Sequence, residues 1–74
     1  MEININKEKA FDLYKTAAKK GNVDAQRSLA SLYELGEGTE KNIEKAIYWY
    51  KKAKENGCLE AKESLNVLLK QQET

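Results

Sequence analysis

Residues 6–38, NKEKAFDLYKTAAKKGNVDAQRSLASLYELGEG, are followed at residues 42–74 by a second version of the same stretch, NIEKAIYWYKKAKENGCLEAKESLNVLLKQQET. At this offset of 36 residues, 12 of the 33 aligned pairs are identical, whereas unrelated stretches of ordinary composition would share about two. An internal repeat of this length is typical of solenoids, in which neighbouring units pack on one another. The identical pairs are Asn6/Asn42, Glu8/Glu44, Lys9/Lys45, Ala10/Ala46, Tyr14/Tyr50, Lys15/Lys51, Ala17/Ala53, Gly21/Gly57, Ala25/Ala61, Ser28/Ser64, Leu29/Leu65 and Leu32/Leu68.

Each copy carries the start and stop signals of two helices joined by a short turn. Asn6 and Asn42 are suited to cap a first helix, because an asparagine side chain accepts from the free amides of the first turn. Gly21 and Gly57 follow about fourteen residues later and supply the left-handed conformation that ends many helices. A second helix is expected to begin almost at once after each of these glycines, and the first of the two ends at Gly36.

The spacing of apolar residues agrees with helices throughout. Apolar residues recur every three or four positions, and no segment alternates with a period of two. The sequence therefore predicts an all-α fold of two antiparallel helix hairpins, four helices in one domain over residues 1–74, with units at about 6–41 and 42–74. Tyr14 and Tyr50 are both predicted to pack inside their hairpins. The predicted stripes are Ala10, Leu13, Tyr14, Ala17 and Ala18; Ala46, Trp49, Tyr50 and Ala53; Ala25, Leu29, Leu32 and Tyr33; and Ala61, Leu65, Leu68 and Leu69.

Composition excludes several functional classes. The 13 basic and 12 acidic side chains nearly cancel, so neither nucleic acid nor an anionic membrane is an expected partner. Without histidine and with the single cysteine Cys58, the chain lacks the usual zinc ligands, and Cys58 lacks a histidine base. We therefore expect no enzyme activity, no cofactor and no metal. A free thiol, and an N-terminus without the layout of a secretory signal, predict a cytoplasmic location.

The repeat resembles the Sel1-like repeats, which are related to tetratricopeptide repeats and contain the pattern A-x-x-W-Y-x-K-A-A-x-x-G-x-x-x-A-x-x-x-L-G-x-x-Y-x-x-G-x-G-V. Leu13 stands where the pattern has tryptophan, and the second unit lacks the closing glycines, as a terminal unit would. The resemblance implies a short right-handed α/α solenoid that acts as a protein-interaction scaffold or adaptor. The second unit matches the pattern at Ala46, Trp49, Tyr50, Lys52, Ala53, Gly57, Ala61 and Leu65.

The predicted first helices of the two units carry net charges of +3 and +2, and the second helices −1 and 0. The resemblance implies that first helices line the concave side, so we expect a basic concave face that binds an acidic peptide or protein surface. The alternative is a solvated fringe of lysines. Tyr48 aligns with Asp12 and is expected to be exposed. The candidate partner-binding residues are Asp12, Lys15, Lys19, Tyr48, Lys51 and Lys52.

Two units leave an apolar surface at each end of the solenoid. Met1, Ile3 and Ile5 are expected to fold back over the N-terminal end, while the polar residues 70–74 end the array. If such covers fail, two copies are expected to associate as a homodimer. A self-assembling structural unit, or a minimal or engineered fragment of a longer solenoid, is therefore the alternative to an adaptor.

Overall fold

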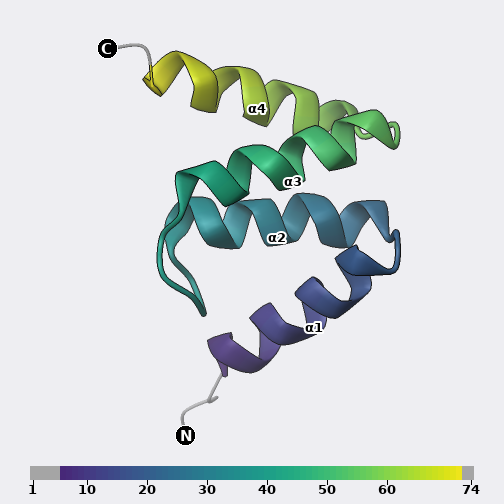
Figure 1. Cartoon of the computed structure of the whole chain (residues 1–74), viewed down its shortest axis with the longest axis vertical. Coiled ribbons are helices and arrows are strands. Elements are labelled where there is room, and N and C mark those ends of the chain that lie inside the picture. Colours follow the sequence, from purple (N-terminus) through teal and green to yellow (C-terminus); the bar gives the residue numbers. More distant parts are fainter. Residues whose placement is uncertain (1–5, 73–74) are drawn as a thin grey trace, which may run out of the picture.

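The computed structural model describes residues 6–72, and they form four helices with no strand among them. The helices are α1 (Lys7–Lys19), α2 (Val23–Leu35), α3 (Ile43–Glu55) and α4 (Leu59–Gln72). Figure 1 shows them stacked in chain order, with α1 against α2, α2 against α3 and α3 against α4. The predicted all-α fold of two helix hairpins is confirmed. Met1, Ile3 and Ile5, the predicted N-terminal cover, lie outside the described residues.

Asparagine side chains fix the starts of three helices. The Asn6 Oδ1 accepts from the Lys9 amide at 3.0 Å, and Asn42 Oδ1 repeats this contact one unit later, at 3.0 Å from the Lys45 amide. Asn22 caps α2 in the same way, 2.9 Å from the Ala25 amide. Each contact satisfies one of the free amides of a helix N-terminus, and such a cap typically stabilises a helix by about 1 kcal/mol.

The two hairpin turns have the same hydrogen-bonded geometry. In the first, the amide of Asn22 donates to the Ala17 carbonyl at 3.1 Å, and in the second the amide of Cys58 donates to the Ala53 carbonyl at 3.0 Å. This closure needs a left-handed residue just after the helix, and Gly21 and Gly57 both have φ of 100°. The repeated glycine therefore sets the same reversal of direction in both units.

The segment between α2 and α3 joins the two units. The Asn42 amide donates to the Tyr33 carbonyl at 2.8 Å, which brings the start of α3 back beside the end of α2. Gly38 has φ of 75°, and a Cβ built at this position would overlap the carbonyl group of Lys7 and touch the Cβ of Phe11. This loop therefore lies directly on α1, and glycine is required there for two separate reasons.

The helix α2 is central to the core. It contacts helices on both sides and buries five residues, whereas the terminal helix α4 buries three. The rings of Phe11 and Tyr33 meet edge to face, with centroids 5.3 Å apart. The core of the described residues is therefore continuous from α1 to α4. Its buried apolar members are Phe11, Ala18, Ala25, Leu29, Ala30, Tyr33, Ala46, Tyr50, Ala53, Ala61, Leu65 and Leu68.

The packing predicted for Tyr14 is wrong. Tyr50 is 4% exposed, but Tyr14 at the same position of the first unit is 41% exposed and its neighbour Leu13 is 64% exposed. The reason is that Tyr50 lies between the units, where its hydroxyl donates to Glu34 Oε1 of α2 at 2.8 Å. Among the described residues, no helix stands on the corresponding side of α1, so Tyr14 lies at an open end of the stack.

Candidate interaction surface

Two adjoining depressions lie between α1 and α3. The first, of about 440 Å³, is lined by residues of α1, α2 and α3. The second, of about 340 Å³, continues toward the hairpin turn of the first unit. We call the two together the basic groove. Its charged and aromatic lining residues are Lys15, Lys19, Tyr33, Glu44, Lys45, Tyr48, Trp49 and Lys52.

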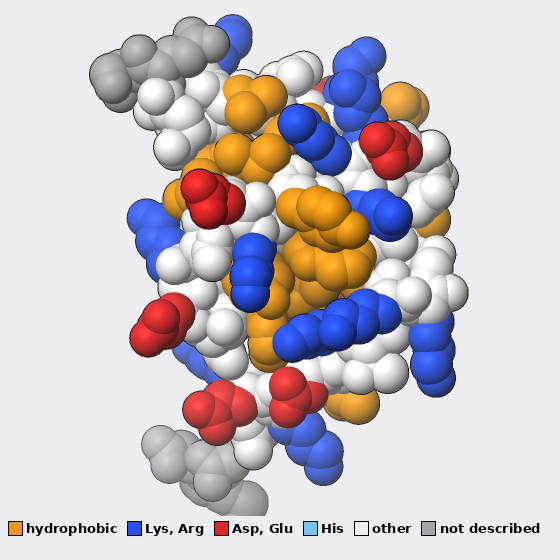
Figure 2. Space-filling model, viewed as in Figure 1, with side chains coloured by type: hydrophobic (Ala, Val, Ile, Leu, Met, Phe, Trp, Pro, Cys, Tyr) orange, Lys and Arg blue, Asp and Glu red, His pale blue; other side chains and the backbone are white. Residues whose placement is uncertain are grey.

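Aromatic rings form the middle of the basic groove. Tyr48 and Trp49 line both depressions, and their rings meet edge to face with centroids 5.0 Å apart. Trp49 is partly buried against the core, whereas Tyr48 is 54% exposed, as predicted. On the face shown in Figure 2, hydrophobic side chains gather near the centre, and lysine and arginine side chains border them. An apolar centre with a charged border is the usual anatomy of a protein-binding surface.

Two of the groove lysines are placed over rings of the core. The Lys15 Nζ lies 5.8 Å from the centroid of the Phe11 ring, and the Lys45 Nζ lies 5.5 Å from that of Tyr33. A cation over an aromatic face gains about 0.5–1 kcal/mol at an exposed site. These contacts favour lysine conformations that hold the charge at the groove, although both side chains are long and flexible.

Gln26 forms a polar link across three helices at the second depression. It is 1% exposed; its Nε2 donates to the Ala18 carbonyl at 3.2 Å, and its Oε1 accepts from Asn56 Nδ2 at 2.9 Å. A buried amide is costly unless its donors and acceptors are paired. Gln26 therefore joins the end of α1 to the end of α3 and holds the floor of the groove in place.

The structure brings four of the six predicted partner-binding residues together. Lys15, Lys19 and Tyr48 line the first depression, and Lys52 joins Lys19 and Tyr48 at the second. The other two, Asp12 and Lys51, are exposed on the same helices but line neither depression. Which of the six meet a partner stays a prediction.

Sequence reasoning missed several groove residues, namely Gln26, Tyr33, Glu44, Lys45, Trp49 and Asn56. A signal for Gln26 was present, because it is spaced three, four and seven residues from Leu29, Ala30 and Tyr33, as on one helix face.

Tyr50 is the residue whose acid–base behaviour the fold clearly alters. Burial, reinforced by the hydrogen bond to Glu34 and its charge, raises the pKa of Tyr50 to about 12. Cys58 is a partly buried free thiol that packs against the core. Within residues 6–72, no three or more acidic, cysteine or histidine side chains are grouped closely enough to hold a metal ion.

The sequence profile of the Sel1 repeat family matches residues 3–22 and 23–58, which together make up most of the chain. The chain belongs to the Sel1 repeat family. The crystal structure of a Sel1 repeat protein from Oxalobacter formigenes is similar, with 36% sequence identity and a TM-score of 0.84. The similarity covers 89% of this chain and 27% of that protein, so the chain spans about a quarter of its relative. No curated protein matches the chain significantly.

Membership of the Sel1 repeat family confirms the stacked helix hairpins as a short α/α solenoid. Sel1 repeats generally mediate protein–protein interaction and typically act as scaffolds without catalytic activity. Of the four Sel1 helices described here, none has the length and apolar character needed to cross a bilayer.

Proposed function

We propose that this Sel1 repeat chain is a non-catalytic interaction module whose basic groove binds an acidic segment of a partner protein. One observation carries the proposal: Lys15, Lys19, Lys45 and Lys52 surround the exposed ring of Tyr48 in adjoining depressions. Glu44 is the one acidic residue that lines the groove within the described chain. A mainly positive charge around an aromatic centre favours an acidic ligand that also carries an apolar side chain.

The proposed ligand has a definite chemistry. Aspartate or glutamate side chains would pair with the lysines, and an apolar side chain between them would lie against Tyr48 and Trp49. Each exposed ion pair contributes little to binding, about 0.2–1 kcal/mol. The affinity therefore depends on the aromatic contact and on several lysines that act together. We therefore expect weak binding that falls as salt concentration rises.

The test uses labelled peptides in which aspartate and glutamate flank one leucine, with fluorescence anisotropy as the readout. Reversing two groove charges with Lys15→Glu and Lys19→Glu should weaken binding at least tenfold. The matched control is Lys62→Glu with Lys70→Glu, which makes the same change in net charge on α4, outside the groove. If both pairs of substitutions weaken binding equally, the effect is one of net charge and the groove is not the site.

A further inference from the structure

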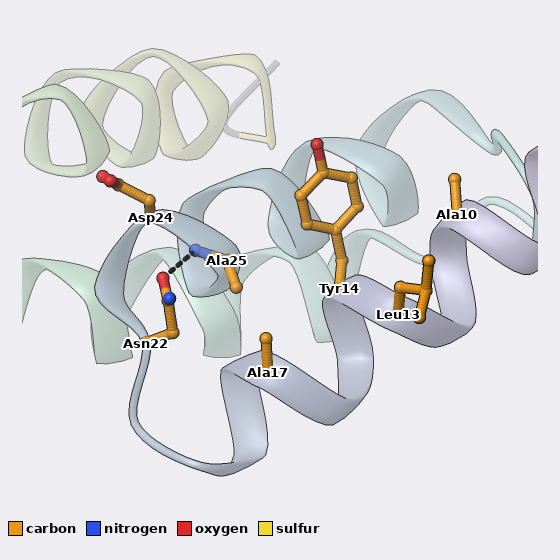
Figure 3. A pocket seen from close by; sticks show the side chains of 7 residues that line it. All are labelled: Ala10, Leu13, Tyr14, Ala17, Asn22, Asp24 and Ala25. Atoms are coloured by element: carbon orange, nitrogen blue, oxygen red, sulfur yellow. Dashed lines mark hydrogen bonds between the residues drawn. The ribbon is translucent and has the colours of Figure 1, made fainter.

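The outer side of α1 and the first turn of α2 enclose a mostly apolar depression of about 490 Å³. Figure 3 shows the side chains of Leu13 and Tyr14 standing out from α1 at this depression, with Ala17 near the turn into α2. Leu13, at 64% exposed, is far more open than an ordinary core leucine. We call this surface the N-terminal face, and its lining residues are Ala10, Leu13, Tyr14, Ala17, Asn22, Asp24 and Ala25.

The second unit contains the same surface in a covered state. Ala46, Tyr50 and Ala53 repeat Ala10, Tyr14 and Ala17 at an offset of 36 residues, and all three are buried. The helix that packs against α3 from the preceding unit is α2, and its Glu34 accepts the hydrogen bond of Tyr50. The α2–α3 junction is therefore a direct template for what the N-terminal face of the first unit can bind.

Three polar contacts and one small residue define this template. The Tyr50 hydroxyl donates to Glu34, and Asn56 Nδ2 donates to Gln26 at 2.9 Å.

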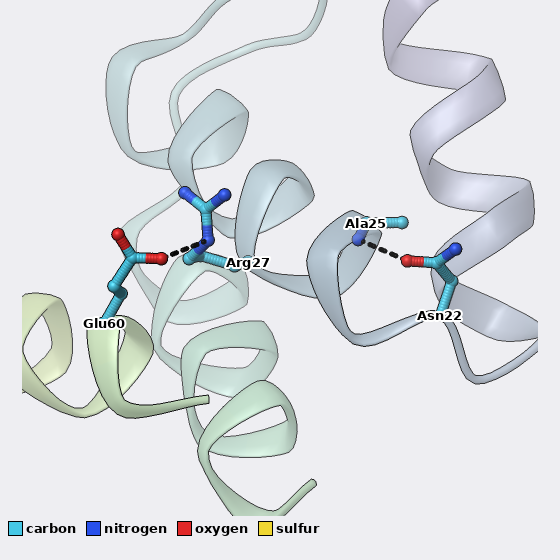
Figure 4. Close-up of polar contacts among 4 residues, drawn as sticks. All are labelled: Asn22, Ala25, Arg27 and Glu60. Carbon is cyan, nitrogen blue, oxygen red and sulfur yellow. Dashed lines mark hydrogen bonds and ion pairs between the residues drawn. The ribbon is translucent and has the colours of Figure 1, made fainter. Parts of the chain in front are cut away.

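On the other side of the junction, the Arg27 Nε lies 3.6 Å from Glu60 Oε1, which Figure 4 shows as a contact between α2 and the start of α4. Ala30 is completely buried and has no side chain beyond its Cβ, so the helices can approach closely. Along α2 these residues read Q-R-x-x-A-x-x-x-E.

The N-terminal face has a counterpart for each contact. Tyr14 stands at the position of Tyr50, Lys20 at that of Asn56, and Asp24 at that of Glu60. Because Lys20 is a cation where Asn56 is an amide, a carboxylate should replace glutamine in the ligand. We infer that the N-terminal face docks an amphipathic helix of another protein with the pattern E-R-x-x-A-x-x-x-E, in which the alanine packs against α1.

A second copy of the chain is a poor match for this face. Its exposed helix at the far end of the stack, α4, would have to stand where α2 stands on α3. Lys62 would then face Lys20, and Glu63 would face Asp24, two pairs of like charge. Asn66 would also replace the small Ala30 at the closest approach. The residues of α4 at the four template positions are Lys62, Glu63, Asn66 and Lys70.

The test uses the intact chain and a labelled peptide with the sequence of residues 22–36, changed to glutamate at position 26. A hydrocarbon staple across positions 28 and 32, off the contact stripe, holds the peptide helical, because free helices of this length are marginal in water. Tyr14→Phe should weaken binding about tenfold through loss of a hydrogen bond to a carboxylate. Ala10→Arg, at a partly buried position on the edge of the face, should abolish it.

Charge matching supplies the sharpest control. Lys20→Asn should weaken binding of the glutamate peptide about fivefold. It should not weaken binding of a peptide with glutamine at position 26, because the substitution recreates the pair formed by Asn56 and Gln26. Tyr48→Ala, in the basic groove, should alter neither affinity, so this outcome is independent of the proposed function. A peptide carrying the four α4 residues should not bind.

Four results would overturn the inference. The first is that the α4-like peptide binds as tightly as the glutamate peptide, and the second is that Ala10→Arg leaves peptide binding unchanged. The third is that the chain forms a homodimer which Ala10→Arg dissociates, and the fourth is that the peptide binds only after residues 1–5 are removed. The third would make a second copy the occupant, and the fourth would make the chain's own N-terminus the occupant.

Discussion

The contact between Tyr50 and Glu34 predicts a specific loss of stability at high pH. Tyr50 is 4% exposed, and its hydroxyl donates to Glu34 Oε1 at 2.8 Å across the junction of the two units. Deprotonation would place a buried phenolate beside a carboxylate. Burial is the larger cause and Glu34 the smaller, and together they raise the pKa of Tyr50 to about 12 from an ordinary value of 10.0.

The sign and size of the effect follow from linkage. Below pH 10 the hydroxyl is protonated in both the folded and the unfolded chain, so the stability is fully present. Between pH 10 and 12 the unfolded chain releases this proton while the folded chain keeps it, so the free energy of unfolding falls. Two pKa units correspond to roughly 2.7 kcal/mol. A chain of 74 residues is expected to have a total stability of about 4–11 kcal/mol, so the loss is large.

The assay is urea unfolding followed by circular dichroism at a series of pH values from 8 to 12. Lysine and tyrosine side chains in general lose protons in this range, so variants must isolate the contribution of Tyr50. Tyr50→Phe should cost about 1 kcal/mol at pH 8 and should then lose less stability than the wild type on going to pH 12. Tyr48→Phe, at an exposed ring, is the matched control and should follow the wild type. Parallel curves for all three proteins would refute this account of the junction.

Two further predictions concern the backbone and the buried amide. Gly38→Ala should destabilise the fold by about 3 kcal/mol or more, because the new Cβ meets the Lys7 carbonyl. Gly21→Ala is also at positive φ but faces open space, so it should cost about 1 kcal/mol. Thermal unfolding of both variants measures the difference, and equal losses of stability would contradict the close contact at Gly38. Gln26→Ala should cost about 2–3 kcal/mol of stability, because it leaves a void and unpaired polar groups. Asn56→Ala, which removes the exposed partner of Gln26, should cost only about 0.5–1 kcal/mol. Denaturant titration measures both losses, and a smaller loss for Gln26→Ala than for Asn56→Ala would show that the hydrogen bonds of Gln26 contribute little.

Local signals were sufficient to predict the helices of this chain. The caps at Asn6 and Asn42 and the turns at Gly21 and Gly57 depend on residues only three to five positions apart. Interactions of this range act within one segment, so tertiary context does not alter them. The same reasoning located Gly36 as the end of the second helix, where φ is 73°.

Burial was harder to predict because it depends on neighbours outside the unit. Tyr14 and Tyr50 occupy the same repeat position, yet among residues 6–72 only Tyr50 has a preceding helix hairpin to pack against. Gln26 was missed because its partners, Ala18 and Asn56, are brought to it by the turns of two different hairpins. The groove lysines were found in part, since charge on the first helices is visible in sequence, but the position of Lys45 over Tyr33 depends on how the two units stack.

The two ends of the solenoid differ in chemistry even though the units are copies. On the N-terminal side, Tyr14 and Asp24 keep the residue types that bind a neighbouring helix in the second unit. On the C-terminal side, α4 has Lys62 and Asn66 where α2 has Gln26 and Ala30, so it does not repeat the residues by which α2 packs against α3. A helix added to one end therefore finds matching contacts, and one added to the other end finds a polar and bulkier surface. These two differences favour the docking of a helix on the N-terminal face over docking on α4.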